Sequence, residues 1–148
     1  FIPGREIRIA VIKKSNYFYV PAIIEYLVSD KNPIRTTEDK LDLNRAGDPY
    51  QQSTNTPLKT MCPADLNDEL KEKITTLAII AHKAIGARDY SLFDFRIDNR
   101  TNEIIFLEAG LFWSFSKTSI ISKMLFSGGD DIVKLIDQIW TYALPNNQ

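Results

Sequence analysis

Alternating apolar and polar residues predict a β-hairpin at the start of the chain. From Glu6 to Ile12, isoleucine and valine at the odd positions alternate with Glu6, Arg8 and Ala10 at the even ones, the period of a strand with two different faces. A polar turn at 13–16 leads into an aromatic and β-branched run at 17–26, which is typical of a second strand. Pro21 lies inside that run, and because proline has no N–H we expect an edge position or a bulge there.

A second hairpin is predicted between residues 90 and 110. Leu92, Asp94 and Arg96 alternate with Phe93, Phe95 and Ile97, and the same period returns from Ile104 to Glu108. If 100–102 form a three-residue loop with Asn102 as its left-handed residue, Asp94 and Glu108 are cross-strand partners. Their Cβ atoms would then be about 5 Å apart.

This pairing of like charges indicates a cation, because two carboxylates directly opposite each other repel. A hard divalent cation such as Mg²⁺ prefers carboxylate oxygens and would make the pair of Asp94 and Glu108 tolerable. The alternative is two solvated carboxylates on an exposed sheet face. We expect both to lie on the face away from the helix predicted at 70–85.

Helical spacing and capping residues predict three helices. The first has Asn67 as its N-cap and Gly86 just past its end. The second begins at Ser116 and runs through Phe126 to two glycines, and Asp130 caps the third. The predicted fold class is α+β, an antiparallel sheet with helices packed on one face.

The segment from Ser29 to Met61 fits neither period and is rich in polar residues and proline. A loop of this length inside a compact domain is usually a functional lid or a disordered segment. We therefore expect a lid-like loop at 29–61.

Composition narrows the class of protein. The 148 residues are 44% hydrophobic and 25% charged with a net charge of −1, which is typical of one globular domain and gives no general attraction to nucleic acid. No apolar run reaches the roughly 20 residues of a membrane span. The single cysteine, Cys62, excludes an internal disulfide and favours a reducing, cytoplasmic setting. Because Phe1 to Gly4 lead straight into a strand, we expect the chain to begin inside a larger fold.

The segments DFRID, FLEAG and the serine-rich stretch that opens a helix resemble the end of D-alanine–D-alanine ligases, which are ATP-grasp ligases. The resemblance runs from PGREIRIAVI at Pro3 through CPADL at Cys62 to the C-terminus, in order and spacing. It implies that residues 1–148 are the C-terminal half of an ATP-grasp fold. It further implies a missing N-terminal half that completes the nucleotide site, and a homodimer is among the assemblies it allows.

The resemblance also implies a chemistry. ATP phosphorylates a small-molecule carboxylate, and an amine attacks the acyl phosphate. Asp94 and Glu108 match the ligands of Mg²⁺, with Mn²⁺ as an alternative, and Glu6 matches a glutamate near the ribose. Gln52 falls where a phosphate-binding lysine is expected, so that role passes to Lys40, Arg45 or Lys59.

Three positions depart from the family pattern. Gly110 replaces a metal-binding asparagine, Leu92 replaces the arginine that stabilises the tetrahedral intermediate, and Trp113-Ser114 replaces a Pro-Gly pair. Counted from Glu108, Ser119 falls on the serine that binds a substrate carboxylate, and Ser114 opens the same loop.

These departures bear on the activity. Arg96 shares a face with Asp94 and could supply some of the lost positive charge, although a plain ion pair also explains it. Because the departures gather at the acceptor end, we expect an ATP-dependent carboxylate–amine ligase with a substrate other than the cell-wall dipeptide. The alternatives are a degenerate ATP-grasp domain that binds nucleotide or a partner without catalysis, and an unrelated α+β domain.

Overall fold

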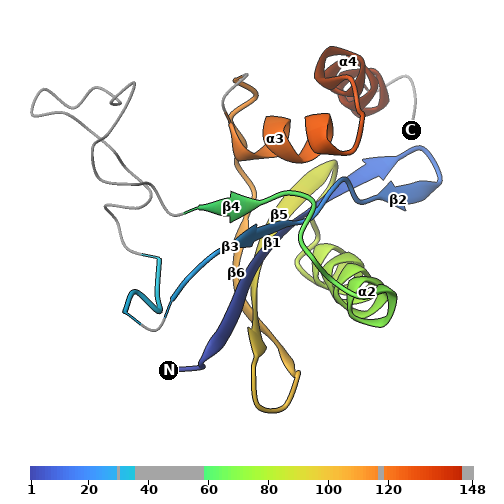
Figure 1. The fold of residues 1–148 in the computed structure, drawn as a ribbon. Helices are drawn as coiled ribbons and strands as arrows, with labels where there is room; N and C mark the ends of the chain where they lie inside the picture. The colour runs from blue at the N-terminus through green and yellow to red at the C-terminus, as the bar shows by residue number, and fades with distance from the viewer. Residues whose placement is uncertain (30, 36–58, 117–118, 145–148) are drawn as a thin grey trace, which may run out of the picture.

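The computed structural model describes residues 1–29, 31–35, 59–116 and 119–144. Its centre is a twisted sheet in the order β4-β3-β1-β5-β6 (Figure 1), with a short strand β2 beside β1. Strand β1 (Gly4–Lys14) pairs antiparallel with β5 (Tyr90–Asp98) from Gly4↔Asp98 to Ile12↔Tyr90. This long pairing joins the two predicted hairpins into one sheet.

The second strand of the first hairpin is interrupted where the proline predicted it. Strands β2 (Tyr17–Tyr19) and β3 (Ile24–Tyr26) both pair with β1, and Pro21 lies in the gap between them. Beyond β3 the described residues add β4 (Thr60–Met61) at the edge of the sheet.

Strand β6 (Ile104–Gly110) confirms the pairing of Asp94 with Glu108, although the loop differs from the one predicted. Four residues, 99–102, form the loop, because the Asp98 N–H donates to the Glu103 carbonyl at 2.9 Å. Asn102 is left-handed as expected, with φ of 58°. Phe95 therefore pairs with Phe106, and a bulge places the extra residue, Leu107, before Glu108. The extra residue in the loop and the extra residue in the bulge offset each other, so Asp94 still pairs with Glu108.

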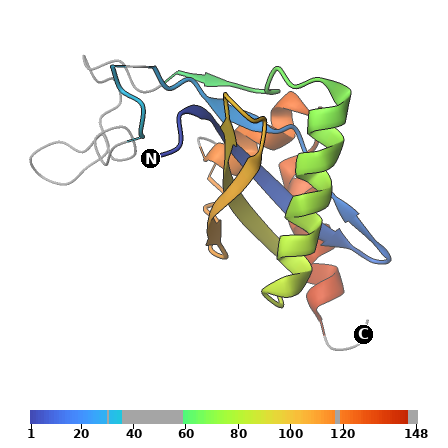
Figure 2. The ribbon, with the colours of Figure 1, turned by 90° about the horizontal axis from the view of Figure 1, so that it is seen from below.

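The predicted fold class is confirmed, but the helices cover both faces of the sheet rather than one. Helix α2 (Asp68–Ala84) packs on the face that carries the odd positions of β1, through Ile74 and Ala78. Helices α3 (Ile120–Ser127) and α4 (Ile132–Ala143) bury their apolar residues on the opposite face, over Ala10 and Ile12. Figure 2 shows α2 and the α3–α4 pair on opposite sides of the central strands.

Helix starts follow the predicted capping for α2 but not for α3 and α4. The Asn67 side chain accepts the Leu70 N–H at 2.9 Å, as expected of an N-cap. Helix α3 is capped by Ser119 instead of Ser116, whose backbone carbonyl accepts the Ser122 hydroxyl. Asp131 caps α4, and Asp130 accepts the Tyr19 hydroxyl. In both helices the predicted cap and the actual cap are residues of the same type, serine in α3 and aspartate in α4. The predicted cap makes a different hydrogen bond in each case.

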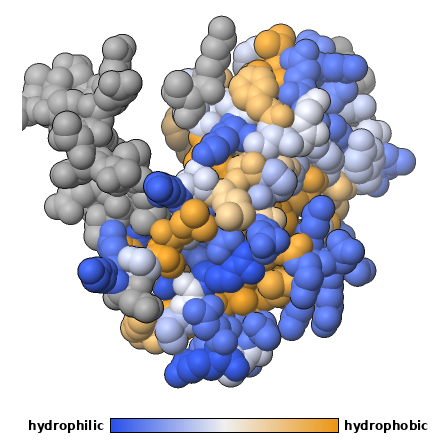
Figure 3. Space-filling model, in the orientation of Figure 1, coloured by the Kyte–Doolittle hydropathy of each residue, from blue (hydrophilic) through white to orange (hydrophobic). Residues whose placement is uncertain are grey.

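The face opposite α2 divides into an apolar end and a charged end. Under α3 and α4 it presents Ala10, Ile12 and Leu92, whereas toward the start of β1 the same face carries glutamate, aspartate and arginine. The space-filling view shows hydrophilic and hydrophobic surface side by side on the visible side of the molecule (Figure 3).

Candidate functional site

The charged end is built by the register of three strands. Glu6 pairs with Arg96 and Arg8 pairs with Asp94 across β1 and β5, and Glu108 lies opposite Asp94 on β6. Even-numbered residues of β1 and β5 share a face, so the pleat places these side chains in one patch. Glu6 and Asp94 therefore each have an arginine directly opposite.

Asp94 is held by two arginines. Arg8 holds it with two bonds of 2.5 Å, from Nε to Oδ1 and from Nη2 to Oδ2. Arg35 donates from Nη2 to the same Oδ2 at 2.9 Å. The Nη2 of Arg8 also lies 3.8 Å from Oε1 of Glu108. One guanidinium nitrogen thus contacts both carboxylates, which explains how these like charges stand side by side.

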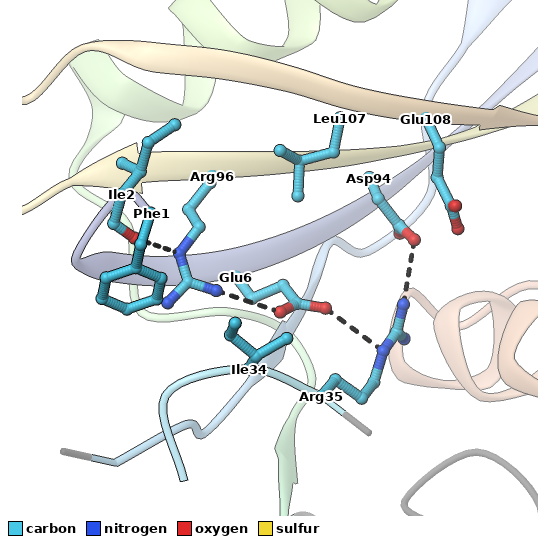
Figure 4. Close-up of a pocket in the computed structure, with 9 residues that line it drawn as sticks. All are labelled: Phe1, Ile2, Glu6, Ile34, Arg35, Asp94, Arg96, Leu107 and Glu108. Carbon is cyan, nitrogen blue, oxygen red and sulfur yellow. Dashed lines mark hydrogen bonds and ion pairs between the residues drawn. The ribbon is translucent and has the colours of Figure 1, made fainter. Parts of the chain in front are cut away.

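Glu6 continues the network in the other direction (Figure 4). It is only 5% exposed, and it lies 3.2 Å from Arg96 Nη1 and 3.2 Å from Arg35 Nε. Arg96 also donates to the carbonyls of Ile2 and Pro33, at 2.7 and 2.6 Å. The guanidinium of Arg35 packs over the Tyr26 ring, 4.0 Å from its centroid.

The arginines set the protonation of Asp94. Burial alone would raise the pKa of this carboxyl, but the hydrogen bonds and charge of Arg8, with the charge of Arg35, outweigh it. The pKa of Asp94 is therefore below its ordinary value, and the residue is ionised at neutral pH. The pKa of Arg8 is raised, because its bonds and charge interaction with Asp94 outweigh its own burial.

Two pockets lie at this network, and Arg8 lines the second of them. The first, of about 360 Å³, is lined by Glu6, Asp94, Glu108, Arg35 and Arg96, with an apolar wall that includes Leu107. The second, of about 280 Å³, is lined by Arg8 and by three serines, Ser114, Ser116 and Ser119. Its apolar side is formed by Leu92, Phe112, Trp113, Ile120 and Ile121. The first pocket is lined by both carboxylates and guanidiniums, whereas the second presents hydroxyl groups and one guanidinium.

The acid pair has the donor chemistry of a magnesium site. Mg²⁺ is commonly held by one or two carboxylates, with water and phosphate oxygens completing the shell. Asp94 and Glu108 supply two such carboxylates around one position that a positively charged nitrogen already occupies. No cluster of three or more His, Cys, Asp or Glu side chains suited to a metal occurs within the described ranges. The residues present therefore fit a metal that arrives with further oxygen ligands.

The structure brings most of the predicted site residues together. Glu6, Asp94, Arg96 and Glu108 share the first pocket, and Ser114 and Ser119 share the second. Ser119 also caps α3, accepting the Ser122 N–H at 3.3 Å. Lys40, Arg45 and Gln52 lie outside the described residues, as does most of the predicted lid. Lys59 is exposed at the edge of β4.

Sequence reasoning missed two central residues. Arg8 was placed among the even positions of the first strand, but its position opposite Asp94 depends on the pairing of β1 with β5. Arg35 lies in a stretch without a period, so no pattern marked it. Only the folded chain shows that both arginines contact Asp94.

Comparison with known proteins assigns the chain to a family. The family model described as "D-ala D-ala ligase C-terminus" matches residues 1–141, which is nearly the whole chain.

The chain belongs to the D-Ala D-Ala ligase C-terminus family.

Two curated relatives show the extent of the similarity. The D-alanine–D-alanine ligase of Desulfotalea psychrophila is 30% identical over 148 residues, covering 100% of this chain and 42% of its own length. That of Clostridium acetobutylicum is 33% identical over 93 residues, covering 63% of this chain and 27% of its own length. The chain thus spans less than half the length of these relatives.

Solved structures agree in fold. The D-alanine–D-alanine ligase of Coxiella burnetii superposes with a TM-score of 0.71 at 20% identity, covering 100% of this chain and 34% of that one. The VanG D-Ala:D-Ser ligase of Enterococcus faecalis gives 0.69 at 20% identity, covering 97% and 37%. The fold is therefore that of the C-terminal part of these ligases. None of the helices in the described part of the chain has the length and apolar character that crossing a membrane requires.

Proposed function

We propose that this chain is the C-terminal part of an ATP-dependent carboxylate–amine ligase that works through an acyl phosphate. The observation that carries the proposal is the opposition of Asp94 and Glu108 at the edge of an open pocket, next to a second pocket lined by serines. Membership of the ligase family supports the reaction class. The phosphates of ATP would enter the first pocket, and the acceptor substrate the second.

In this proposal Asp94 and Glu108 hold Mg²⁺ or Mn²⁺. A metal bound there would neutralise charge on the phosphates during phosphoryl transfer. A crystal structure of a relative, the D-alanine–D-alanine ligase of Bacillus anthracis, is described as complexed with ATP, at 16% identity and a TM-score of 0.68. That likeness supports nucleotide binding by the family fold, with Glu6 near the ribose end as the resemblance implies.

The chain's own residues bind and orient the substrates. Ser114 and Ser119 present hydroxyl groups to the second pocket, where they can donate hydrogen bonds to a substrate carboxylate. Arg8 lines the second pocket and contacts both metal-ligand candidates of the first. Its guanidinium is better placed than Arg96 to stabilise negative charge on a reacting carboxylate, because Nε, Nη1 and Nη2 of Arg96 all have partners already. Arg96 is then a residue that positions Glu6.

The lining of the second pocket supports a choice of substrate class. Phe112, Trp113 and Ile120 form part of its apolar wall, and Trp113 stands with Ser114 where the resemblance implies a Pro-Gly pair. A hydrocarbon or aromatic group on the substrate would gain from burial there. We therefore propose a substrate other than the cell-wall dipeptide, and a further part of the protein to complete the nucleotide site.

A second candidate function is a degenerate ATP-grasp domain that binds nucleotide or a partner without turnover. The observation that favours it is the saturation of Asp94 by two arginines, together with Gly110 and Leu92 at positions where the resemblance implies functional side chains.

An isotope experiment on the full-length protein separates the two candidates. The protein is incubated with ATP, Mg²⁺, an amine and a panel of ¹⁸O-labelled carboxylic acids, and the phosphate released is analysed by ³¹P NMR. A ligase that forms an acyl phosphate transfers one ¹⁸O from the carboxylate to the phosphate. Unlabelled acids give the baseline. ATP binding without ADP release would support the degenerate domain, and ADP release without ¹⁸O transfer would rule out the acyl phosphate.

A further inference from the structure

We propose that Arg35 is an internal counter-cation that keeps the Asp94–Glu108 pair closed to a free divalent cation and that releases Asp94 when a metal binds. The inference rests on the proposed metal role of these two carboxylates. It identifies the group that is hydrogen-bonded to Asp94 before a ligand binds.

The first argument is the occupancy of one oxygen. Oδ2 of Asp94 accepts from Arg8 at 2.5 Å and from Arg35 at 2.9 Å. An ionised carboxylate oxygen has about two lone-pair positions, and both are used here. A metal cannot bind this oxygen until one arginine leaves. Oδ1 accepts one bond, from Arg8 at 2.5 Å, so Oδ2 is the oxygen that Arg35 closes.

The second argument identifies the arginine that can leave. Arg8 stands in the middle of β1, with β5 on one side and β3 on the other, so its backbone is held by the sheet. Arg35 lies outside every strand and reaches the site by its side chain, which is only 6% exposed. Movement of Arg35 costs its contacts with Asp94, Glu6 and the Tyr26 ring, and leaves the sheet unchanged.

The third argument is charge. The network contains three carboxylates, those of Glu6, Asp94 and Glu108, and three guanidiniums, those of Arg8, Arg35 and Arg96. It is neutral as it stands, so a divalent ion added to it brings two uncompensated positive charges into a partly buried site. If Arg35 withdraws, half of that excess is removed, and the anionic oxygens of a phosphate group can remove the rest. A metal would therefore bind with an anion and poorly by itself.

The test uses Mn²⁺ alone, titrated into residues 1–148 and followed by the loss of the free-ion EPR signal. Wild type should bind Mn²⁺ weakly, in the millimolar range. Arg35→Gln keeps a hydrogen-bond donor but removes the charge, and it should bind Mn²⁺ at least tenfold more tightly. Arg100→Gln is the matched control, because Arg100 pairs with Asp98 on the hairpin loop and its side chain is 69% exposed. The control should bind as wild type does.

A double variant tests the occupancy of Asp94 at unchanged net charge. Glu6→Gln with Arg35→Gln removes one charge of each sign, so the network remains neutral while Asp94 loses its second arginine. It should show the same tighter binding if Arg35 acts by occupying Asp94. Circular dichroism confirms the fold of each variant before titration, and micromolar binding of Mn²⁺ by wild type would overturn the proposal without any variant.

Adding Glu108→Gln separates this proposal from the proposed function. In the Arg35→Gln background it should abolish the gain. If wild type and Arg35→Gln bind equally and Glu108→Gln weakens both, the role of Arg35 is wrong and the metal ligands stand. If Glu108→Gln changes nothing in either background, both assignments fail.

Discussion

Asp94 and Glu108 lie directly opposite each other on β5 and β6, and one nitrogen of Arg8 contacts both, at 2.5 and 3.8 Å. The like charges are therefore held together by an arginine of the neighbouring strand. This arrangement explains how a pair of acids is tolerated on a partly buried face. It also makes Arg8 the residue on which the local stability of the site depends.

Arg8→Met should destabilise the fold by roughly 3 kcal/mol, because it removes the principal partner of a buried carboxylate while keeping most of the apolar volume. Asp94 is only 3% exposed, so water cannot replace the lost bonds fully. Urea unfolding measures the change. Arg88→Met is the control, since Arg88 pairs with Asp89 at the surface with its side chain 68% exposed, and should cost less than about 1 kcal/mol. Equal losses in the two variants would show that the Arg8–Asp94 pair has no special role.

Stability should fall between pH 7.5 and pH 5 because of His82, the chain's only histidine. Burial lowers the pKa of this side chain, and Lys13 lowers it further, against an opposing effect of Asp89. Its Nδ1 lies 2.7 Å from the Ser91 hydroxyl, and it is only 1% exposed. The unfolded chain binds the proton more readily than the folded one, so acidification below the ordinary pKa of about 6.5 favours unfolding.

Thermal melting across this pH range measures the effect in wild type and in His82→Gln. The contribution of His82 to the wild-type slope cannot exceed about 1.4 kcal/mol per pH unit, because it is a single proton. The variant should lose most of the slope, whatever its absolute stability. A slope that survives in His82→Gln would assign the pH dependence to other groups.

Residues 1–148 alone should bind Mg-ATP no better than about millimolar, or roughly −4 kcal/mol. In the proposed function the nucleotide is held between this part and a further part of the protein, and phosphoryl transfer depends on positioning by both. Isothermal titration calorimetry gives the affinity directly. A micromolar affinity would mean that the described pockets form a complete nucleotide site.

The sequence predicted the position of the acid pair better than it predicted the hairpin that produces it. Alternation placed Asp94 and Glu108 on one face, and that conclusion survived because two errors cancelled: the loop has one more residue than expected, and the bulge at Leu107 compensates for it. The bulge left no sign in the pattern, because Leu107 fits the alternation of a regular strand.

The pairing of β1 with β5 could not be predicted from the alternation of apolar and polar residues. It joins residues about ninety positions apart, as in Glu6↔Arg96 and Arg8↔Asp94, and local periodicity contains no information about partners at that distance. The arginine network therefore appeared only with the fold. The same limit explains why the helices were expected on one face, since an apolar stripe shows that a helix is buried but not on which side of the sheet.

The most direct test of the account is the rate of ADP release by the full-length protein after Glu108→Gln, measured with Mg²⁺, an amine and a carboxylic acid that wild type accepts. Glu103→Gln is the control, because Glu103 is exposed just before the same strand, beside the hairpin loop and away from both pockets. Glutamine keeps the shape of the side chain and removes the charge that a metal needs. The account predicts that Glu108→Gln lowers ADP release at least about a hundredfold with the fold intact, while Glu103→Gln leaves it unchanged. Equal rates for Glu108→Gln and wild type would contradict it.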